Sequence, residues 1–225
     1  MPLPVSVVDN PAAAFLSVGT EPPLPRIVRS MLDTVEEPSR TVIATAASLV
    51  GDVRTALASR DLAAVSVAAV GGLAHRADCL GAALEYLQRA AFSTSHVLVY
   101  DIATPLAPAD LAARVVEGMR CGGAVVMPAL AVTDSVKAVD GHGSITATVD
   151  RSVLRAVQYP RGFTVDALAG LLERGASADF DEIAVAIDAA VPVTFVDGDP
   201  DAFRAELPED AEFVEAITAS RISGA

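Results

Sequence analysis

The chain has 225 residues, of which 52% are hydrophobic, and its formal net charge is −13. This length suits one domain with a large core, so we expect residues 1–225 to form a single domain. The negative charge argues against nucleic acid or an anionic membrane surface as a partner. The sequence contains no run of about 18 uncharged apolar residues that could span a membrane.

The N-terminus and the cysteines bear on the cellular compartment. The stretch MPLPVSVVDN lacks the basic region and the continuous apolar region of a signal peptide. Cys79 and Cys121 are the only cysteines, and they do not follow a metal-binding spacing. We therefore expect reduced thiols and a cytoplasmic protein.

Apolar runs of strand length alternate with segments of helical period along the first 130 residues. We expect strands over Val5–Val8, Thr41–Ala46, Ala64–Val70, His96–Tyr100 and Gly122–Met127, and helices over Leu24–Thr34, Ala77–Arg89 and Asp110–Met119. Short connections between such elements are typical of β-α-β units. The order predicts an α/β fold that is Rossmann-like, with a doubly wound and mostly parallel sheet.

The pattern changes after residue 130. Two β-prone segments, Ser135–Val139 and Ile145–Val149, flank DGHGS, whose two glycines can adopt the positive φ of a tight turn. We expect a β-hairpin arm inserted over residues 132–159. After the arm we expect helices over Thr164–Arg174 and Asp181–Ala190, a strand over Val193–Val196 and a last helix starting near Pro208.

Several stretches, in order, resemble the methylerythritol phosphate cytidylyltransferase family. HVLVYDIATPL resembles the family strand that ends in Asp-Ala-Ala-Arg-Pro, and LAVTDSVKAVDGHGSITATVDRSVLRAVQYPRGF resembles its arm. FDEIAVAI resembles the T-D-[DE] segment, and VTFVDGDPDAFRAELPEDAEFVEAI resembles the closing motif. VGGLAHRADCLGAAL is a weaker match to G-G-x-x-R-x-x-S. The resemblance implies a nucleotidyltransferase fold, CTP and Mg²⁺ as substrate and cofactor, a polyol phosphate as acceptor in isoprenoid synthesis, and a homodimer whose arms cover each other's sites.

On the nucleotide side, the resemblance implies that Gly71, Gly72, Arg76, Cys79 and Asp101 contact CTP, with Asp101 also holding Mg²⁺. Cys79 stands where the family has serine, and one extra residue separates the glycines from Arg76. Asp101 follows a predicted strand, where ligand sites of α/β proteins lie. The alternatives are an ordinary strand-to-helix turn for the glycines and a helix-capping carboxylate for Asp101.

On the acceptor side, the same resemblance gives six positions: Thr104, Ser135, Arg151, Tyr159, Asp181 and Arg204. Thr104 replaces a family arginine, Tyr159 replaces a threonine, and Arg204 replaces a lysine. The changes at Thr104 and Tyr159, with Phe180 in place of a second family threonine, predict a smaller and less positive acceptor pocket. Arg151 is retained in the arm, where the family uses it across the dimer; the alternative is a structural ion pair.

The first connection departs most from the family pattern. The family has P-A-A-G-x-G-x-R-x-G there, and the stretch VSVVDNPAAAF has neither these glycines nor the loop arginine. Without that backbone cradle and its cations, several kcal/mol of transition-state stabilisation are lost, by order of magnitude. We therefore favour a catalytically impaired, non-catalytic dimeric paralogue with a binding or regulatory role, which binds CTP weakly and pairs with itself or with a catalytic paralogue. The alternative is an active nucleotidyltransferase with another nucleotide or acceptor, in which Arg26 and Arg29 replace the loop.

Overall fold

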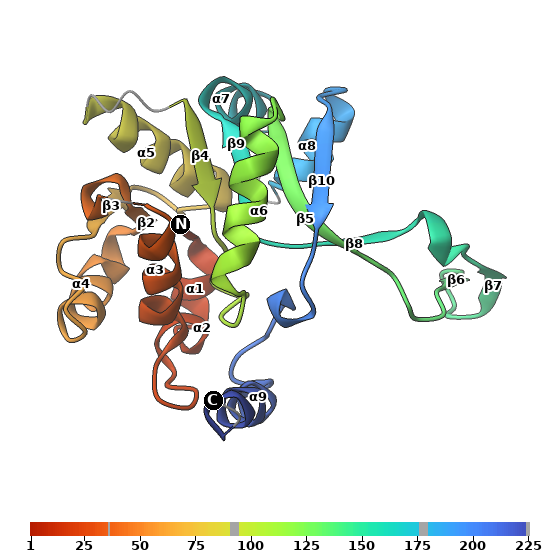
Figure 1. Cartoon of the computed structure of the whole chain (residues 1–225), viewed down its shortest axis with the longest axis horizontal. Helices are drawn as coiled ribbons and strands as arrows, with labels where there is room; N and C mark the ends of the chain where they lie inside the picture. The colour runs from red at the N-terminus through yellow and green to blue at the C-terminus, as the bar shows by residue number, and fades with distance from the viewer. Residues whose placement is uncertain (36, 91–94, 176–179, 224–225) are drawn as a thin grey trace.

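The computed structural model describes residues 1–35, 37–90, 95–175 and 180–223. Strands form a central layer with helices on both of its faces, and one long arm leaves this body (Figure 1). Helix α3 packs on α4 and α6, while α5 packs on α7 and α7 packs on α8. The fold is thus the α/β, doubly wound arrangement that the alternating pattern predicts.

The first half of the chain builds a parallel three-stranded sheet. Its strands are β1 (Pro2–Leu3), β2 (Val42–Ala46) and β3 (Ser66–Val70), in the order β1-β2-β3. The longer helices of this half are α3 (Pro23–Thr34), α4 (Val50–Ala58) and α5 (Arg76–Arg89). All five residues of β2 are buried, as expected of a strand covered on both faces.

The second half builds a mixed sheet in the order β10-β5-β9-β4, with β8 beside β5. Its strands are β4 (His96–Val99), β5 (Val125–Ala131), β8 (Arg155–Val157), β9 (Arg161–Thr164) and β10 (Val193–Asp197). Strands β5 and β10 are parallel, whereas β9 runs antiparallel to β4 and β5. The helices are α6 (Ala109–Arg120), α7 (Val165–Arg174), α8 (Glu182–Asp188) and α9 (Ala211–Ser223). Single 3₁₀ turns occur at Pro38–Arg40, Ala47–Leu49, Arg151–Val153 and Pro200–Ala202.

The expected first strand over Val5–Val8 is wrong. Residues 5–9 form helix α1 (Val5–Asp9), followed by α2 (Ala12–Phe15), and the strand is the pair Pro2–Leu3. Val7 is buried in the core and Ser6 is exposed. One turn of helix therefore buries Val7 directly after the strand, and this packing outweighs the β propensity of the valines. The connection from β1 to α3 consists of these two short helices and a turn at Gly19.

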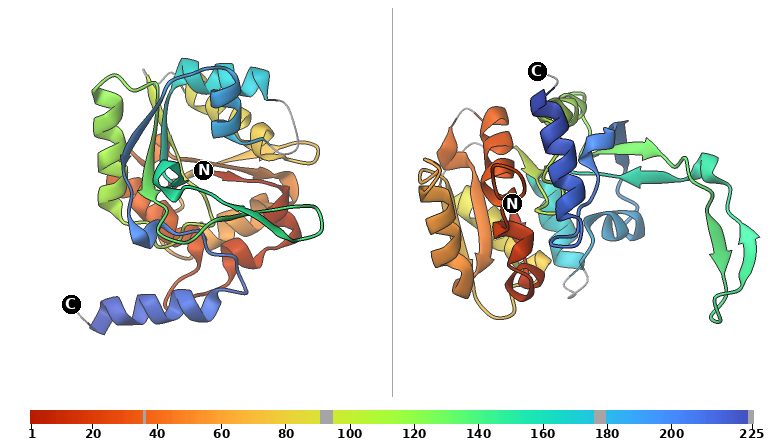
Figure 2. Two further views of the ribbon diagram at one scale, coloured as in Figure 1. Left: turned by 90° about the vertical axis from the view of Figure 1, so that its right-hand side faces the viewer. Right: turned by 90° about the horizontal axis from the view of Figure 1, so that it is seen from below.

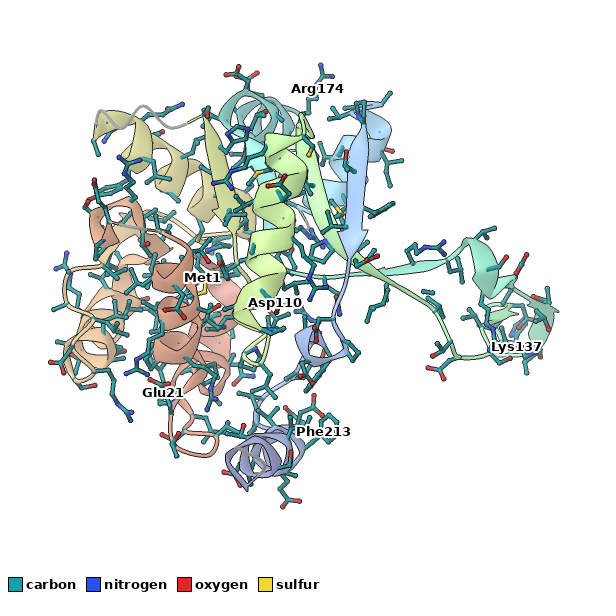
Figure 3. The ribbon with its side chains drawn as sticks, in the orientation of Figure 1. Met1, Glu21, Asp110, Lys137, Arg174 and Phe213 are labelled. Atoms are coloured by element: carbon teal, nitrogen blue, oxygen red, sulfur yellow. The ribbon has the colours of Figure 1, made fainter. Side chains whose placement is uncertain are left out.

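The arm contains a separate two-stranded sheet, β6 (Lys137–Val139) and β7 (Ile145–Thr148). Its base is anchored because β8 pairs antiparallel with the end of β5. Figure 2 shows the arm extending far from the body, and Figure 3 labels Lys137 on it. Val139, Ile145 and Val153 are 60%, 68% and 74% exposed in the single chain, so the arm has apolar side chains without cover.

The core of the body consists of several hydrophobic clusters. One surrounds Leu3, Ile43 and the helices α3 and α4, and another surrounds Phe163, Leu171 and Val125. Helix α9 packs through Val214 on Leu207 at the side of the body where the C-terminus lies (Figure 2). Within the described residues, no helix is both long enough and apolar enough to cross a bilayer.

Candidate functional site

A cavity of about 550 Å³ opens beside the carboxyl end of β4. It is lined by the chain around β1 and α1, by the start of α5, by Asp101 and Ile102 after β4, by β9 and by the start of α8. This is the edge of an α/β sheet where ligands bind. The charged groups of the cavity come from separate segments of the chain, so the fold, and not sequence proximity, assembles them.

Arg76, the first residue of α5, is the centre of this cluster. Its Nε donates to Glu182 Oε1 at 2.9 Å, and its Nη1 donates to Asp101 Oδ2 at 2.9 Å. Its Nη2 donates to the Tyr159 hydroxyl at 2.8 Å and lies 2.8 Å from Glu182 Oε1. Burial acts to lower the pKa of Arg76, but the nearby Glu182, Tyr159 and Asp101 raise it above its ordinary value. All three guanidinium nitrogens are therefore engaged by groups of the chain itself.

Glu182 lies at the start of α8 and its side chain is only 1% exposed. Besides Arg76, its carboxylate accepts a hydrogen bond from Arg161 Nη1 at 2.7 Å and one from the Tyr159 hydroxyl at 3.2 Å. A buried carboxylate is stable only when it is paired and hydrogen-bonded in this way. Asp181 is half exposed at the N-cap of α8 and lies 3.4 Å from Arg161 Nη1.

The Tyr159 ring lies close to both arginines. The Arg161 guanidinium carbon is 4.0 Å from the ring centroid and that of Arg76 is 5.2 Å away, so both make cation–π contacts. Burial and the neighbouring Glu182 raise the pKa of Tyr159 above its ordinary value, which keeps the hydroxyl protonated. The Tyr159 ring therefore packs against both guanidinium groups and helps to hold them in place.

The family resemblance implies that Asp101 binds a metal ion, and the geometry of this residue tests that role. Its Oδ2 accepts from Arg76, its Oδ1 accepts from the backbone N–H of Ala103 at 2.9 Å, and Arg204 lies 3.8 Å from Oδ1. No group of three or more His, Cys, Asp or Glu side chains suited to a metal ion occurs in the part of the chain that is described. Each carboxylate oxygen already accepts one hydrogen bond, so a Mg²⁺ ion held here through one carboxylate and substrate phosphates would have to share Asp101 with Arg76.

The two glycines lie in a second, more open cavity of about 690 Å³, at the carboxyl end of β3. Gly71 and Gly72 line it with Leu73 and the first turns of α5, and Gly72 has a φ of +70° that favours glycine. A Cβ at either glycine would meet no atom within 4 Å, so the approach to their backbone is open. Cys79 is elsewhere: it is fully buried, with Sγ 3.7 Å from the carbonyl oxygens of Leu3 and Ala74.

None of the remaining predicted residues forms an ion pair with Arg76 in the described part of the single chain. Thr104 is buried just after β4, and its hydroxyl donates to the Asp101 carbonyl at 3.0 Å. Ser135 and Arg151 are exposed on the arm, where Arg151 donates to the Thr133 carbonyl. Arg204 is 65% exposed and lines the cluster cavity from the segment before α9.

Sequence reasoning missed two members of the cluster, Glu182 and Arg161. The signals were present, since Glu182 is the third residue of the T-D-[DE]-like segment and Arg161 stands in the QYPRGF stretch. The two arginines expected to replace the loop in the active alternative do not line this cavity. Arg26 donates to the Val18 carbonyl, Arg29 pairs with Glu21, and neither lines the cluster cavity.

The arrangement is electrically balanced. Three cations (Arg76, Arg161, Arg204) face three carboxylates (Asp101, Asp181, Glu182). An anion that entered could contact exposed Arg204 and Arg161 Nε, which has no hydrogen-bond partner among the described residues, but to reach Arg76 it would have to displace a carboxylate. The cluster can hold the segments around it together, but it offers little free positive charge to a triphosphate.

Comparison with known proteins places these features in a family. The sequence matches the family model of 2-C-methyl-D-erythritol 4-phosphate cytidylyltransferase over residues 8–220. It is 34% identical over 213 residues to the protein of that name from Rhodococcus jostii, covering 95% of this chain and 89% of the relative. A protein of the same name from Nocardia farcinica is 42% identical over 107 residues, which are 46% of this chain and 45% of the relative.

Solved structures that resemble this chain include proteins of the same family. The crystal structure of 2-C-methyl-D-erythritol 4-phosphate cytidylyltransferase from Thermus thermophilus superposes with a TM-score of 0.72 and 28% identity, covering 93% of this chain and 94% of that one. A crystal structure of 4-diphosphocytidyl-2C-methyl-D-erythritol synthase has a TM-score of 0.76 at 24% identity, covering 92% of this chain and 94% of that one, and supports the fold.

Proposed function

This chain belongs to the 2-C-methyl-D-erythritol 4-phosphate cytidylyltransferase family, and we propose that it is a member without significant turnover of its own, acting as a dimeric binding or regulatory protein. The observation that carries the proposal is the engagement of Arg76 by Glu182, Asp101 and Tyr159. Of the five residues that the family resemblance assigns to the nucleotide, Arg76 and Asp101 are joined to each other in this ion-pair cluster.

Two further features support the same proposal. The connection from β1 to α3 contains no glycine before Gly19 and folds into α1 and α2, so it does not offer the bare backbone N–H groups that cradle phosphates. Asp101, the residue for a metal, has both oxygens engaged. Transfer of a nucleotidyl group depends on positioning and on charge stabilisation at the phosphates. In this chain the phosphate-cradling loop is replaced by α1 and α2, and the carboxylate for the metal ion is engaged by Arg76 and Ala103.

The test is pyrophosphate release from CTP with methylerythritol phosphate and Mg²⁺, measured beside the Rhodococcus jostii relative as a positive control. We expect no release above background for this chain and CTP binding that is no tighter than about millimolar by calorimetry. A rate within about a hundredfold of the roughly 10 per second that is usual for enzymes would refute the proposal. Micromolar, Mg²⁺-dependent binding of CTP would also refute it.

A second candidate is an active nucleotidyltransferase with another nucleotide or acceptor. It is favoured by the open cavity of about 550 Å³, in which Asp101, Arg76 and exposed Arg204 are brought together. Each of the four nucleoside triphosphates, with Mg²⁺, should then raise the melting temperature to a different extent. If one of them gives a saturable shift at micromolar concentration and the others do not, this candidate replaces the first.

The partner is proposed to be a second copy of the chain, or a catalytic paralogue, bound through the arm. The support is the exposure of Val139, Ile145 and Val153, together with the projection of the arm away from the body (Figure 1). Apolar side chains grouped on a projecting segment are typical of an interaction surface. In such a dimer Arg151 would be placed near the partner's site, which is the role the family resemblance assigns to it.

A further inference from the structure

A third cavity, of about 370 Å³, lies in the sheet layer where the two sheets meet. It follows β4 along its whole length, from Ser95 to Tyr100, and reaches β2 at Thr41 and Val42. Helices α3, α5 and α6 complete its walls. Met1, labelled in Figure 3, lines the cavity at the centre of the body.

The cavity exists because the two sheets are not joined by a ladder. Strand β1 has two residues, which pair with Ala44 and Thr45 of β2. Strand β4 pairs with β9 on one side, and no described strand pairs with its other side. The edge of β4 therefore faces a space that β1 does not fill.

The lining has an unusual composition for a chain of net charge −13. The described residues that line the cavity include no Asp or Glu. The walls are mostly aliphatic, with buried Met31, Leu80 and Leu84 among them. The arginines and the histidine of the lining, Arg40, Arg120 and His96, are exposed and so lie at the rim, whereas Tyr100 is buried. Arg40 and Arg120 pair at 3.4 and 3.8 Å with Glu37 and Glu117, two exposed carboxylates outside the lining.

One polar side chain inside points to a ligand. Thr41 is 2% exposed, and its Oγ1 has no hydrogen-bond partner among the described residues. An unpaired buried hydroxyl is costly, so such a group is a candidate for contact with a bound molecule. Thr41 follows Arg40 directly in the chain, which places the unpaired hydroxyl and a rim cation at the same end of the cavity.

We propose that this cavity binds an amphipathic anion: an aliphatic body between α3, α5 and β4, with a carboxylate or phosphate head at Thr41, Arg40 and Arg120. Cavities of roughly 300–1,000 Å³ with apolar walls and a few polar groups are typical of small-molecule sites. No Asp or Glu is among the described lining residues, and the glutamates that pair with Arg40 and Arg120 are exposed and loosely held at 3.4 and 3.8 Å, so the lining favours an anion over a cation. The site is separate from the Arg76 cluster, since the two cavities share no described lining residue.

The first experiment is isothermal titration calorimetry of the whole protein with four eight-carbon probes: octanoate, octyl phosphate, octan-1-ol and octylammonium. We expect the anions to bind at least about tenfold more tightly than the alcohol, and the ammonium to give no measurable heat. The difference between octanoate and octyl phosphate tells which head group is preferred. Equal affinity for anions and alcohol, or no binding of either anion, would overturn the proposal.

Matched variants locate the site. Arg120→Gln changes a rim residue that is 74% exposed, and Arg89→Gln changes an arginine that is 80% exposed on α5 and outside the lining. We expect the first to weaken anion binding several-fold and the second to leave it unchanged; equal effects would indicate non-specific attraction and overturn the proposal. Ala83→Phe, which places a ring in the cavity, should abolish binding of every probe. If that variant does not fold, the two arginine variants still decide.

Discussion

Replacement of Glu182 by glutamine should destabilise the protein strongly. The side chain is 1% exposed and its carboxylate pairs with Arg76 at 2.8 Å and with Arg161 at 2.7 Å. Glutamine keeps the volume but removes the charge, which leaves two largely buried guanidinium groups with one counterion fewer. Breaking a buried ion pair by changing one partner costs about 3–5 kcal/mol. Since the amide oxygen still accepts a hydrogen bond, we expect the lower end, about 3 kcal/mol.

Urea unfolding followed by far-ultraviolet circular dichroism measures this change. With an m-value of about 3 kcal/mol/M for a chain of this size, the midpoint should fall by about 1 M. Glu85→Gln is the control, because Glu85 is 64% exposed and pairs with exposed Arg89 in the same helix. Its effect on the free energy of unfolding should stay within about 0.5 kcal/mol.

If the urea midpoint of Glu182→Gln lies as close to that of the wild type as the midpoint of Glu85→Gln does, the reasoning is refuted. The carboxylate would then not be needed to neutralise the two arginines. The double variant Arg161→Met, Glu182→Gln adds a check. If the two residues stabilise each other, the double variant loses less stability than the sum of the single ones. The same Glu182→Gln change makes the cluster more positive by one unit, so CTP should bind more tightly to the folded variant than to wild type.

Three further outcomes are expected. Gly162→Ala should lower the free energy of unfolding by about 1–3 kcal/mol, because the new Cβ would lie 2.6 Å from Met119 Sδ. The control Gly81→Ala in α5 adds a Cβ that meets nothing within 4 Å and should stabilise the protein slightly, and urea unfolding compares the two variants. Burial raises the pKa of the Cys79 thiol to about 11, so iodoacetamide at a pH of about 8 should label only exposed Cys121 until urea is added. Mass spectrometry counts the labels, and two labels on the native protein would contradict this prediction. Ile145→Glu on the arm should convert a dimer to a monomer in light scattering, and a wild-type monomer at micromolar concentration would show that the arm does not mediate a dimer.

Much of the fold could be predicted from the sequence because period and composition agree locally. Strands β2, β3, β4 and β10 and helices α3, α5, α6 and α7 lie within a few residues of the predicted ranges. These segments are buried on a continuous apolar side, so their local pattern and their tertiary packing favour the same structure. The hairpin in the arm was also predicted, from two glycines between β-prone runs.

The failures have physical causes. The short strands β8 and β9 were missed because their sequences, RAV and RGFT, do not alternate between apolar and polar residues. Arg161 in β9 is a charged residue that is buried because it pairs with Glu182, and an apolar pattern cannot reveal such a position. The candidate site was predicted only in part for a related reason. Sequence comparison gave positions for Arg76, Asp101 and Tyr159, but it could not show that their charges and hydrogen bonds are directed at each other and at Glu182.

The short strand β1 has a consequence for how the protein opens. Side chains such as those of Leu3 and Tyr100 connect the β1-β2-β3 sheet with the sheet that contains β4, but no described backbone ladder does. Backbone amides exchange with solvent in cooperative units that follow such boundaries. Amide hydrogen exchange should therefore resolve two protected units, one around β2 and one around β5 and β9. Partial separation of these units at their junction, without global unfolding, would give solvent and small molecules a path to the interior.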